Sequence, residues 1–159
     1  MILYFLRHAD AVPPGTGGDA ARRLSEKGVA SMRAAAAVWQ RLNIRPEVVI
    51  SSPLPRARET AELLVEALEG RAGALVTDDR LAPGAEWSDL AQAMAPHAAA
   101  RRVMFVGHEP DLSAAVELLT RAASVRMRKG GLACLEFPGT PEPGSGELAW
   151  LIDPDLYDA

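Results

Sequence analysis

Hydrophobic residues along the chain fall into two kinds of pattern, short continuous runs and longer stretches with helical spacing. Continuous apolar runs, typical of buried strands, cover residues 1–7, 47–50, 74–77 and 102–106. Between these runs, apolar side chains recur every three or four residues, which predicts helices over 25–42, 52–68 and 87–94 and within 107–122. This alternation of strand and helix is typical of an α/β domain with parallel strands at its centre.

The end of the chain departs from this alternation. Residues 131–137 and 146–152 both have strand character, and the Pro- and Gly-rich segment 138–145 joins them. We therefore expect an antiparallel hairpin at the edge of the sheet. The predicted fold is a three-layer α/β/α sandwich whose central sheet is mostly parallel. Since no linker or repeat divides the sequence, residues 1–159 are expected to form a single domain.

The predicted helices carry start signals and an apolar face. Ser25 is a plausible N-cap for the first helix. The apolar positions expected to face the sheet are Val29, Met32, Ala36, Trp39 and Leu42. Pro53 is expected at the first position of the second helix, and Ser52 is a candidate N-cap for that helix. Asp111 is expected to cap the last helix, and Glu109 also to serve that helix start.

Composition and charge exclude several classes of protein. The chain has 159 residues, 48% of them hydrophobic, and no apolar run long enough to span a membrane. Its single cysteine, Cys134, cannot form an internal disulfide, and no metal-binding motif is present. A formal net charge of −4 argues against general binding to nucleic acid or to anionic membranes. We expect a cytoplasmic protein without cofactor or metal.

The chemistry-bearing residues follow three of the predicted strands. Arg7 and His8 end the first strand, Arg56 follows the second after a Ser-Pro-rich turn, and His108 follows residues 102–106. Parallel strands would bring these ends to one edge of the sheet, where ligands of open α/β folds bind. Arginines and a helix N-terminus favour an oxyanion, and an imidazole can accept a phosphoryl group. Taken singly, each of these residues is more often structural, but their ordered set predicts a phosphate pocket.

These residues resemble a known family. The segments FLRHAD, SSPLPRARETA and VGHEP are similar to the motifs of the histidine phosphatase superfamily, also called phosphoglycerate mutase-like. RHADA, the RRLSEKG stretch and the Leu81 to Pro83 segment resemble its small SixA-type phosphohistidine phosphatases. The resemblance covers nearly the whole chain. It implies a phosphoglycerate mutase-like fold without a large capping insertion.

The resemblance also implies roles for individual residues. His8 would be the nucleophile that forms a phosphohistidine intermediate, and Arg7, Arg56 and His108 would hold the phosphoryl oxygens without a metal. Ser52 is a further residue that could contact phosphate. The third motif residue, usually glycine, is Ala9 here, a mild departure. We expect Gly107 to allow a sharp backbone turn that brings His108 to the ligand.

The general acid is the least defined part of the predicted site. Larger members of the family resemble one another in having an acidic residue after the third strand, and Glu86 is the best positional match, ahead of Asp78, Asp79 and Asp89. SixA-type members lack a clear equivalent. Imidazole protonates near pH 6.5 and leaves far more easily than an alkoxide, so a phosphohistidine substrate needs less help from an acid. An uncapped pocket would also admit a histidine on a protein surface.

Three functions remain open at this point. The leading one is a metal-independent phosphatase acting on a phosphohistidine-bearing signalling or phosphotransfer protein and releasing inorganic phosphate. The second is a phosphatase for small phosphomonoesters, which an effective acid at Glu86 would favour. The third is a phosphate- or phosphoprotein-binding module without turnover. The basic run at residues 126–129, with Arg22, is most simply a solvated patch; alternatively it borders the pocket and steers an acidic partner.

Overall fold

A single six-stranded sheet forms the centre of the computed structural model, which describes residues 1–157. Its strands are β1 (Ile2–Arg7), β2 (Val48–Ser51), β3 (Ala74–Thr77), β4 (Arg102–Gly107), β5 (Leu132–Glu136) and β6 (Glu147–Ile152). Their spatial order is β3-β2-β4-β1-β5-β6. The first four strands of the chain pair in parallel, whereas β5 and β6 are antiparallel to their neighbours. The predicted sheet is thus confirmed, including its antiparallel edge.

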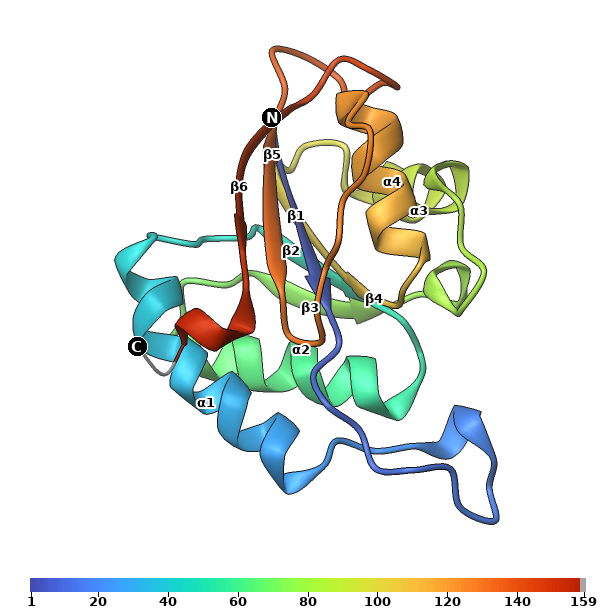
Figure 1. Cartoon of the computed structure of the whole chain (residues 1–159). Coiled ribbons are helices and arrows are strands. Elements are labelled where there is room, and N and C mark those ends of the chain that lie inside the picture. The colour runs from blue at the N-terminus through green and yellow to red at the C-terminus, as the bar shows by residue number, and fades with distance from the viewer. Residues whose placement is uncertain (158–159) are drawn as a thin grey trace.

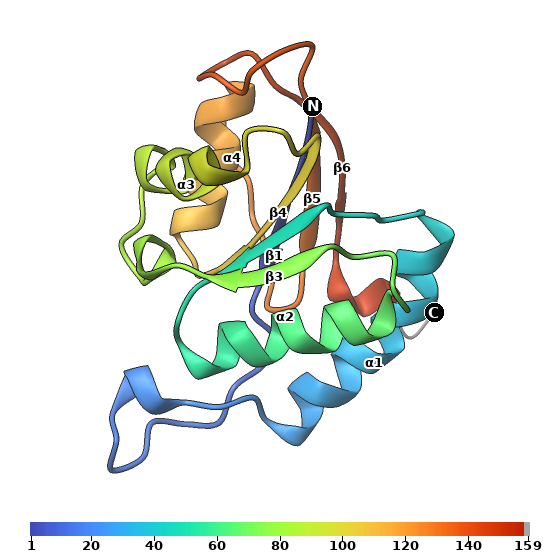
Figure 2. The same cartoon turned by 180° about the vertical axis from the view of Figure 1, so that it is seen from behind.

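Helices cover both faces of this sheet (Figures 1 and 2). The helices are α1 (Glu26–Arg41), α2 (Pro55–Ala67), α3 (Trp87–Met94) and α4 (Asp111–Thr120). In both views α1 and α2 lie together on one face, and α3 and α4 on the other. This arrangement confirms the predicted three-layer α/β/α sandwich. None of the helices within residues 1–157 is long and apolar enough to cross a membrane.

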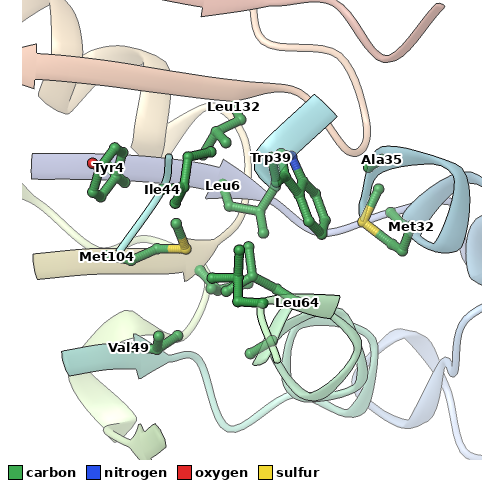
Figure 3. Close-up of a cluster of buried hydrophobic side chains, with 14 of the residues drawn as sticks. Tyr4, Leu6, Met32, Ala35, Trp39, Ile44, Val49, Leu64, Met104 and Leu132 are labelled. Carbon is green, nitrogen blue, oxygen red and sulfur yellow. The ribbon is translucent and has the colours of Figure 1, made fainter. Parts of the chain in front are cut away.

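The layers are joined by two apolar cores, one on each face of the sheet. Successive residues of β1 point to opposite faces, so Tyr4 and Leu6 contribute to one core and Phe5 to the other. The first core packs β1, β2 and β4 against α1 and α2, with the fully buried Trp39 near its centre (Figure 3). Because both faces of the central strands are covered, their continuous apolar runs are explained.

Helix α1 begins as predicted, and Met32, Trp39 and the partly buried Val29 face the core as expected, whereas Ala36 and Leu42 do not. Ser25 is its N-cap, and its side chain accepts a hydrogen bond from the Gly28 N–H at 3.0 Å. The buried positions are Gly28, Met32, Ala35 and Trp39. The expectation for Leu42 is wrong: it lies at the C-cap, beyond the last turn that contacts the sheet, and is 41% exposed. Ala36 is only partly buried because Ala35 takes the inward position.

The starts of α2 and α4 also differ from prediction. Helix α2 begins at Pro55, and its N-cap is Leu54, so neither Pro53 nor Ser52 has the expected capping position. The reason is that residues 52–54 form a turn first. Asp111 is the first helical residue of α4 rather than its cap, and its carboxylate instead accepts a hydrogen bond from the Gly84 N–H at 2.8 Å.

Candidate active site

The parallel strands β1, β2 and β4 bring three loops to one edge of the sheet. Because β4 lies between β1 and β2, the residue after each strand can bond to β4: the His8 N–H donates to the Gly107 carbonyl at 3.0 Å, and the Ser52 N–H to the Val106 carbonyl at 2.9 Å. A pocket of about 280 Å³ opens at this edge. Its lining residues are Arg7, His8, Asp19, Arg22, Arg56, Pro83, His108, Glu109 and Lys129.

His8 lies in this pocket with a defined tautomer. Its Nδ1 atom is 2.7 Å from the Ala9 carbonyl oxygen, which can only accept, so Nδ1 carries the proton. The other ring nitrogen, Nε2, accepts a hydrogen bond from Arg56 Nε at 3.3 Å. Burial, with a smaller effect of the nearby cations, lowers the pKa of His8 to about 3. At neutral pH, Nε2 is therefore unprotonated, and it can act as a nucleophile when its lone pair is released from Arg56 Nε.

His108 faces His8, with 5.2 Å between the ring centroids. Its Nε2 is 2.7 Å from the Ser52 hydroxyl, and burial lowers its pKa to about 4. Nδ1 of His108 is buried and has no hydrogen-bond partner among residues 1–157. When the Ser52 hydroxyl donates to Nε2, the neutral ring carries its proton on Nδ1 and offers it to a ligand. Ser52 is thus placed to orient His108.

Arg7 and Arg56 contribute positive charge to the pocket, beside Arg22 and Lys129 in its lining. Arg56 is 4% exposed and comes from the first turn of α2. Arg7 ends β1, and its Nη1 donates to the Met127 carbonyl at 2.9 Å. Its Nε–H is buried and has no partner in the part of the chain that the structure describes. Arg7 and His108 both line the pocket, and each has a buried N–H donor of the kind that a bound water or ion usually satisfies.

The sequence did not reveal the role of Asp19. This residue begins a short 3₁₀ helix, Asp19–Ala21, in the loop between β1 and α1. Its carboxylate accepts a hydrogen bond from Arg56 Nη2 at 3.0 Å and its carbonyl accepts one from Nη1 at 2.8 Å. The Arg22 side chain also donates to this carboxylate, and with Arg56 it lowers the pKa of Asp19. An anion that binds Arg56 therefore competes with Asp19.

Glu86 and Glu109 have different positions relative to this pocket. Glu86 is the N-cap of α3, where it forms a capping box with Asp89, and it lines a separate cavity beside Trp87. The structure therefore does not bring Glu86 together with His8. Glu109 does line the pocket; its carboxylate also accepts from Ser113 of α4, as expected for a residue that serves the helix start. Burial raises the pKa of Glu109.

Two glycines act through close packing. A Cβ on Gly28 would lie 2.1 Å from the Asp10 carbonyl oxygen, so glycine lets α1 approach the loop that follows His8. Gly107 is the last residue of β4, directly before His108, and its φ is not positive. A Cβ on Gly107 would instead meet Leu112 Cδ2 at 3.3 Å, so its small size serves the packing of α4 beside His108.

The geometry describes a cationic pocket around a neutral imidazole, which suits phosphoryl transfer. Within the described residues, no three His, Cys, Asp or Glu side chains gather as metal ligands. A model of the histidine phosphatase superfamily (branch 1) matches residues 3–128. The chain belongs to the histidine phosphatase superfamily. This finding agrees with the family resemblance of the motifs around Arg7, Arg56 and His108.

Relatives of this phosphatase domain include SixA-type proteins. An uncharacterized protein from Picosynechococcus sp. is 32% identical, over 83% of this chain and 82% of its own length. A solved structure of the protein histidine phosphatase SixA with tungstate has a TM-score of 0.84 at 23% identity, covering 98% of this chain and 99% of that one. A SixA-type structure from Agrobacterium tumefaciens has a TM-score of 0.79 at 26% identity, covering 96% and 97%.

The same histidine phosphatase fold occurs in an enzyme with another substrate. The solved structure of a mycobacterial glucosyl-3-phosphoglycerate phosphatase has a TM-score of 0.63 at 20% identity, covering 92% of this chain and 96% of that one. The fold thus carries phosphatases of protein and of small-molecule substrates. Phosphatase chemistry follows from the family, and the substrate must be argued from the pocket.

Proposed function

We propose that this protein is a metal-independent phosphatase that hydrolyses phosphohistidine on a signalling or phosphotransfer protein. The observation that carries the proposal is the unprotonated Nε2 of His8, in one pocket with Arg7, Arg56 and His108. A phosphoryl group at this place would have its nucleophile and its neutralising donors in one pocket. The SixA-type relatives support the same reaction.

The proposed reaction has two steps. In the first, His8 Nε2 attacks phosphorus, the N–P bond of the substrate breaks, and the leaving imidazole takes a proton from solvent. Arg7, Arg56 and His108 hold the non-bridging oxygens during this transfer. In the second step, water attacks the phosphorus bound to His8, the new N–P bond breaks, and inorganic phosphate leaves. Throughout, Nδ1 of His8 keeps its proton and donates it in a hydrogen bond to the Ala9 carbonyl oxygen, and this bond fixes the orientation of the ring.

The choice of phosphohistidine rests on the leaving group. Imidazole, with a pKa of about 6.5, departs without the strong acid that an alkoxide requires. Glu86, the residue proposed from sequence as an acid, lines a different cavity. The pocket mouth carries exposed side chains, among them Asp19 and Lys129, whose exposed fractions are 59% and 43%. A histidine on the surface of another protein can reach such an open site.

A small-molecule phosphomonoesterase is a second candidate function. It is favoured by Glu109, a carboxyl group with a raised pKa in the pocket lining that could protonate an ester oxygen. The Glu109→Gln variant separates the two functions, with Glu86→Gln as its control. If Glu109 is such an acid, its variant loses turnover of phosphomonoesters and keeps that of phosphohistidine, whereas the control keeps both.

The central experiment measures phosphate release by metal-free enzyme from a phosphohistidine-bearing carrier protein and from an aryl phosphomonoester. The wild type should act faster on the carrier, and His8→Ala should release no phosphate from either. His97→Ala is the matched control, because this histidine lies after α3 in the short helix Ala95–His97, outside the pocket lining. Activity retained by His8→Ala would refute the nucleophile. Faster turnover of the ester would favour the second function, and no release from either substrate would indicate a binding module.

A further inference from the structure

A larger cavity adjoins the pocket of His8. It has a volume of about 650 Å³ and is bounded by the first turns of α1, the loop of residues 126–129 and residues 154–155. Arg7, Glu109 and Lys129 line both cavities. The two cavities are therefore neighbours with three lining residues in common, and we call the larger one the basic groove.

The basic groove is cationic in an otherwise acidic protein. Five cationic side chains line it, against three carboxylates, whereas the whole chain has a formal net charge of −4. Its cationic residues are Arg7, Lys27, Arg126, Arg128 and Lys129. Lys129 pairs with Asp10, and Arg128 with Asp153 and Asp155. Within residues 1–157, Lys27 and Arg126 form no ion pair, so their charge is available to a partner.

The exposure of these cations favours a protein partner over a small molecule. Lys27, Arg126, Arg128 and Lys129 are all exposed. A site for a small ligand presents a few buried polar groups that fix its orientation. Flexible exposed charges at the border of a site instead raise the rate at which an oppositely charged surface associates, and they suppress partners of the wrong charge.

We propose that the basic groove is the docking surface for an acidic face of the protein that carries the phosphohistidine. The proposal rests on the proposed function and specifies its substrate further. Lys27 and Arg126 attract the acidic face, and because Arg7 and Lys129 line both cavities, a protein seated on the groove lies beside the pocket of His8. Lys27 and Arg126 are specificity residues for the carrier and do not contact the transferred phosphoryl group.

The experiment compares two substrates with the same bond to be broken. One is an acidic phosphocarrier protein phosphorylated on histidine, and the other is free phosphohistidine, which is too small to dock. The groove variant is Lys27→Glu with Arg126→Glu. Its matched control is Arg33→Glu with Arg71→Glu, two exposed arginines outside the groove, which changes the net charge by the same amount.

At low ionic strength, the groove variant should lower kcat/KM for the carrier about 30-fold, mainly through KM, and leave free phosphohistidine within about twofold. The loss should shrink in high salt, because exposed charges are screened. Equal losses in the groove and control variants would show an effect of net charge alone and overturn the docking surface. If kcat/KM for free phosphohistidine falls as much as that for the carrier, the groove acts on the small anion itself, and the docking surface is also overturned.

The result for the wild type separates this inference from the proposed function. If the wild type releases no phosphate from the carrier or from free phosphohistidine, the proposed function itself is wrong and its docking surface with it. If the wild type acts on both substrates at a rate that neither Lys27 nor Arg126 influences, the phosphatase stands and the basic groove is refuted as its docking surface.

Discussion

Lowering the pH from 7 to 5 should destabilise this fold through His8 and His108. Burial holds the pKa of His8 at about 3 and that of His108 at about 4, against about 6.5 in an unfolded chain. Below pH 6.5 the unfolded chain therefore binds protons that the folded protein does not. The contribution of these groups to stability is present above pH 6.5 and is lost as the pH falls toward 4 and then 3.

The size of the effect follows from these pKa values. At pH 5 an unfolded histidine is almost fully protonated, which favours unfolding by about 2 kcal/mol for each buried imidazole that stays neutral. His8 and His108 together then lower the free energy of unfolding by about 4 kcal/mol. This is a large part of the roughly 5 to 15 kcal/mol by which a domain is usually stable. Most carboxylates titrate below this pH range, so the two imidazoles dominate the change.

The assay is urea unfolding of the wild type and of a His8→Gln/His108→Gln double variant, each at pH 7 and at pH 5. Glutamine stays neutral at both values, so the double variant should lose about 4 kcal/mol less than the wild type between them. His97→Gln serves as a control outside the pocket. Parallel losses in the wild type and the double variant would show that both imidazoles titrate normally in the fold, and the argument for a neutral His8 would then fail.

Three other substitutions test single contacts. Asp19→Asn should raise the affinity for inorganic phosphate, measured by inhibition, about fivefold, because the carboxylate no longer competes for Arg56; a lower affinity would make Asp19 a positioning residue. Gly28→Ala should cost about 2 kcal/mol in urea unfolding, since its Cβ would overlap the Asp10 carbonyl; an unchanged midpoint would refute this packing. Trp39→Ala should cost about 4 kcal/mol by the same method, and a loss below about 1 kcal/mol would contradict its place in the core.

Local patterns predicted the architecture well, because strand and helix periods are properties of neighbouring residues. The run at residues 102–106 became β4, and the alternation of strands and helices placed it in a parallel sheet. The same topology explains why His8 and His108 lie close together although they are a hundred residues apart in the sequence. The centroids of their rings are 5.2 Å apart. Helix starts were less predictable: Pro53 and Pro55 both fit a first turn, and the turn at residues 52–54 decides between them.

The contacts that the sequence could not predict join segments without a local pattern. Asp19 lies in a Gly-rich loop, and nothing near it indicates that it bonds to Arg56, 37 residues later. Glu86 had a favourable position after the third strand, but the capping box at the start of α3 points it to another cavity. In the sequence, the basic run at residues 126–129 looks like any solvated patch. Only the structure shows that Arg7 and Lys129 line both its cavity and that of His8.

The low pKa of His8 has opposite effects on the two halves of the proposed reaction. An imidazole that resists protonation is a weak nucleophile, so transfer of a phosphoryl group from an ordinary histidine to His8 would be unfavourable without further interactions. The same property makes His8 a good leaving group when water attacks the phosphoenzyme. The first step therefore depends on Arg7 and Arg56, whose charges stabilise the phosphoryl group once it is bound. Burial alone would stop the reaction, and burial beside two arginines allows both steps.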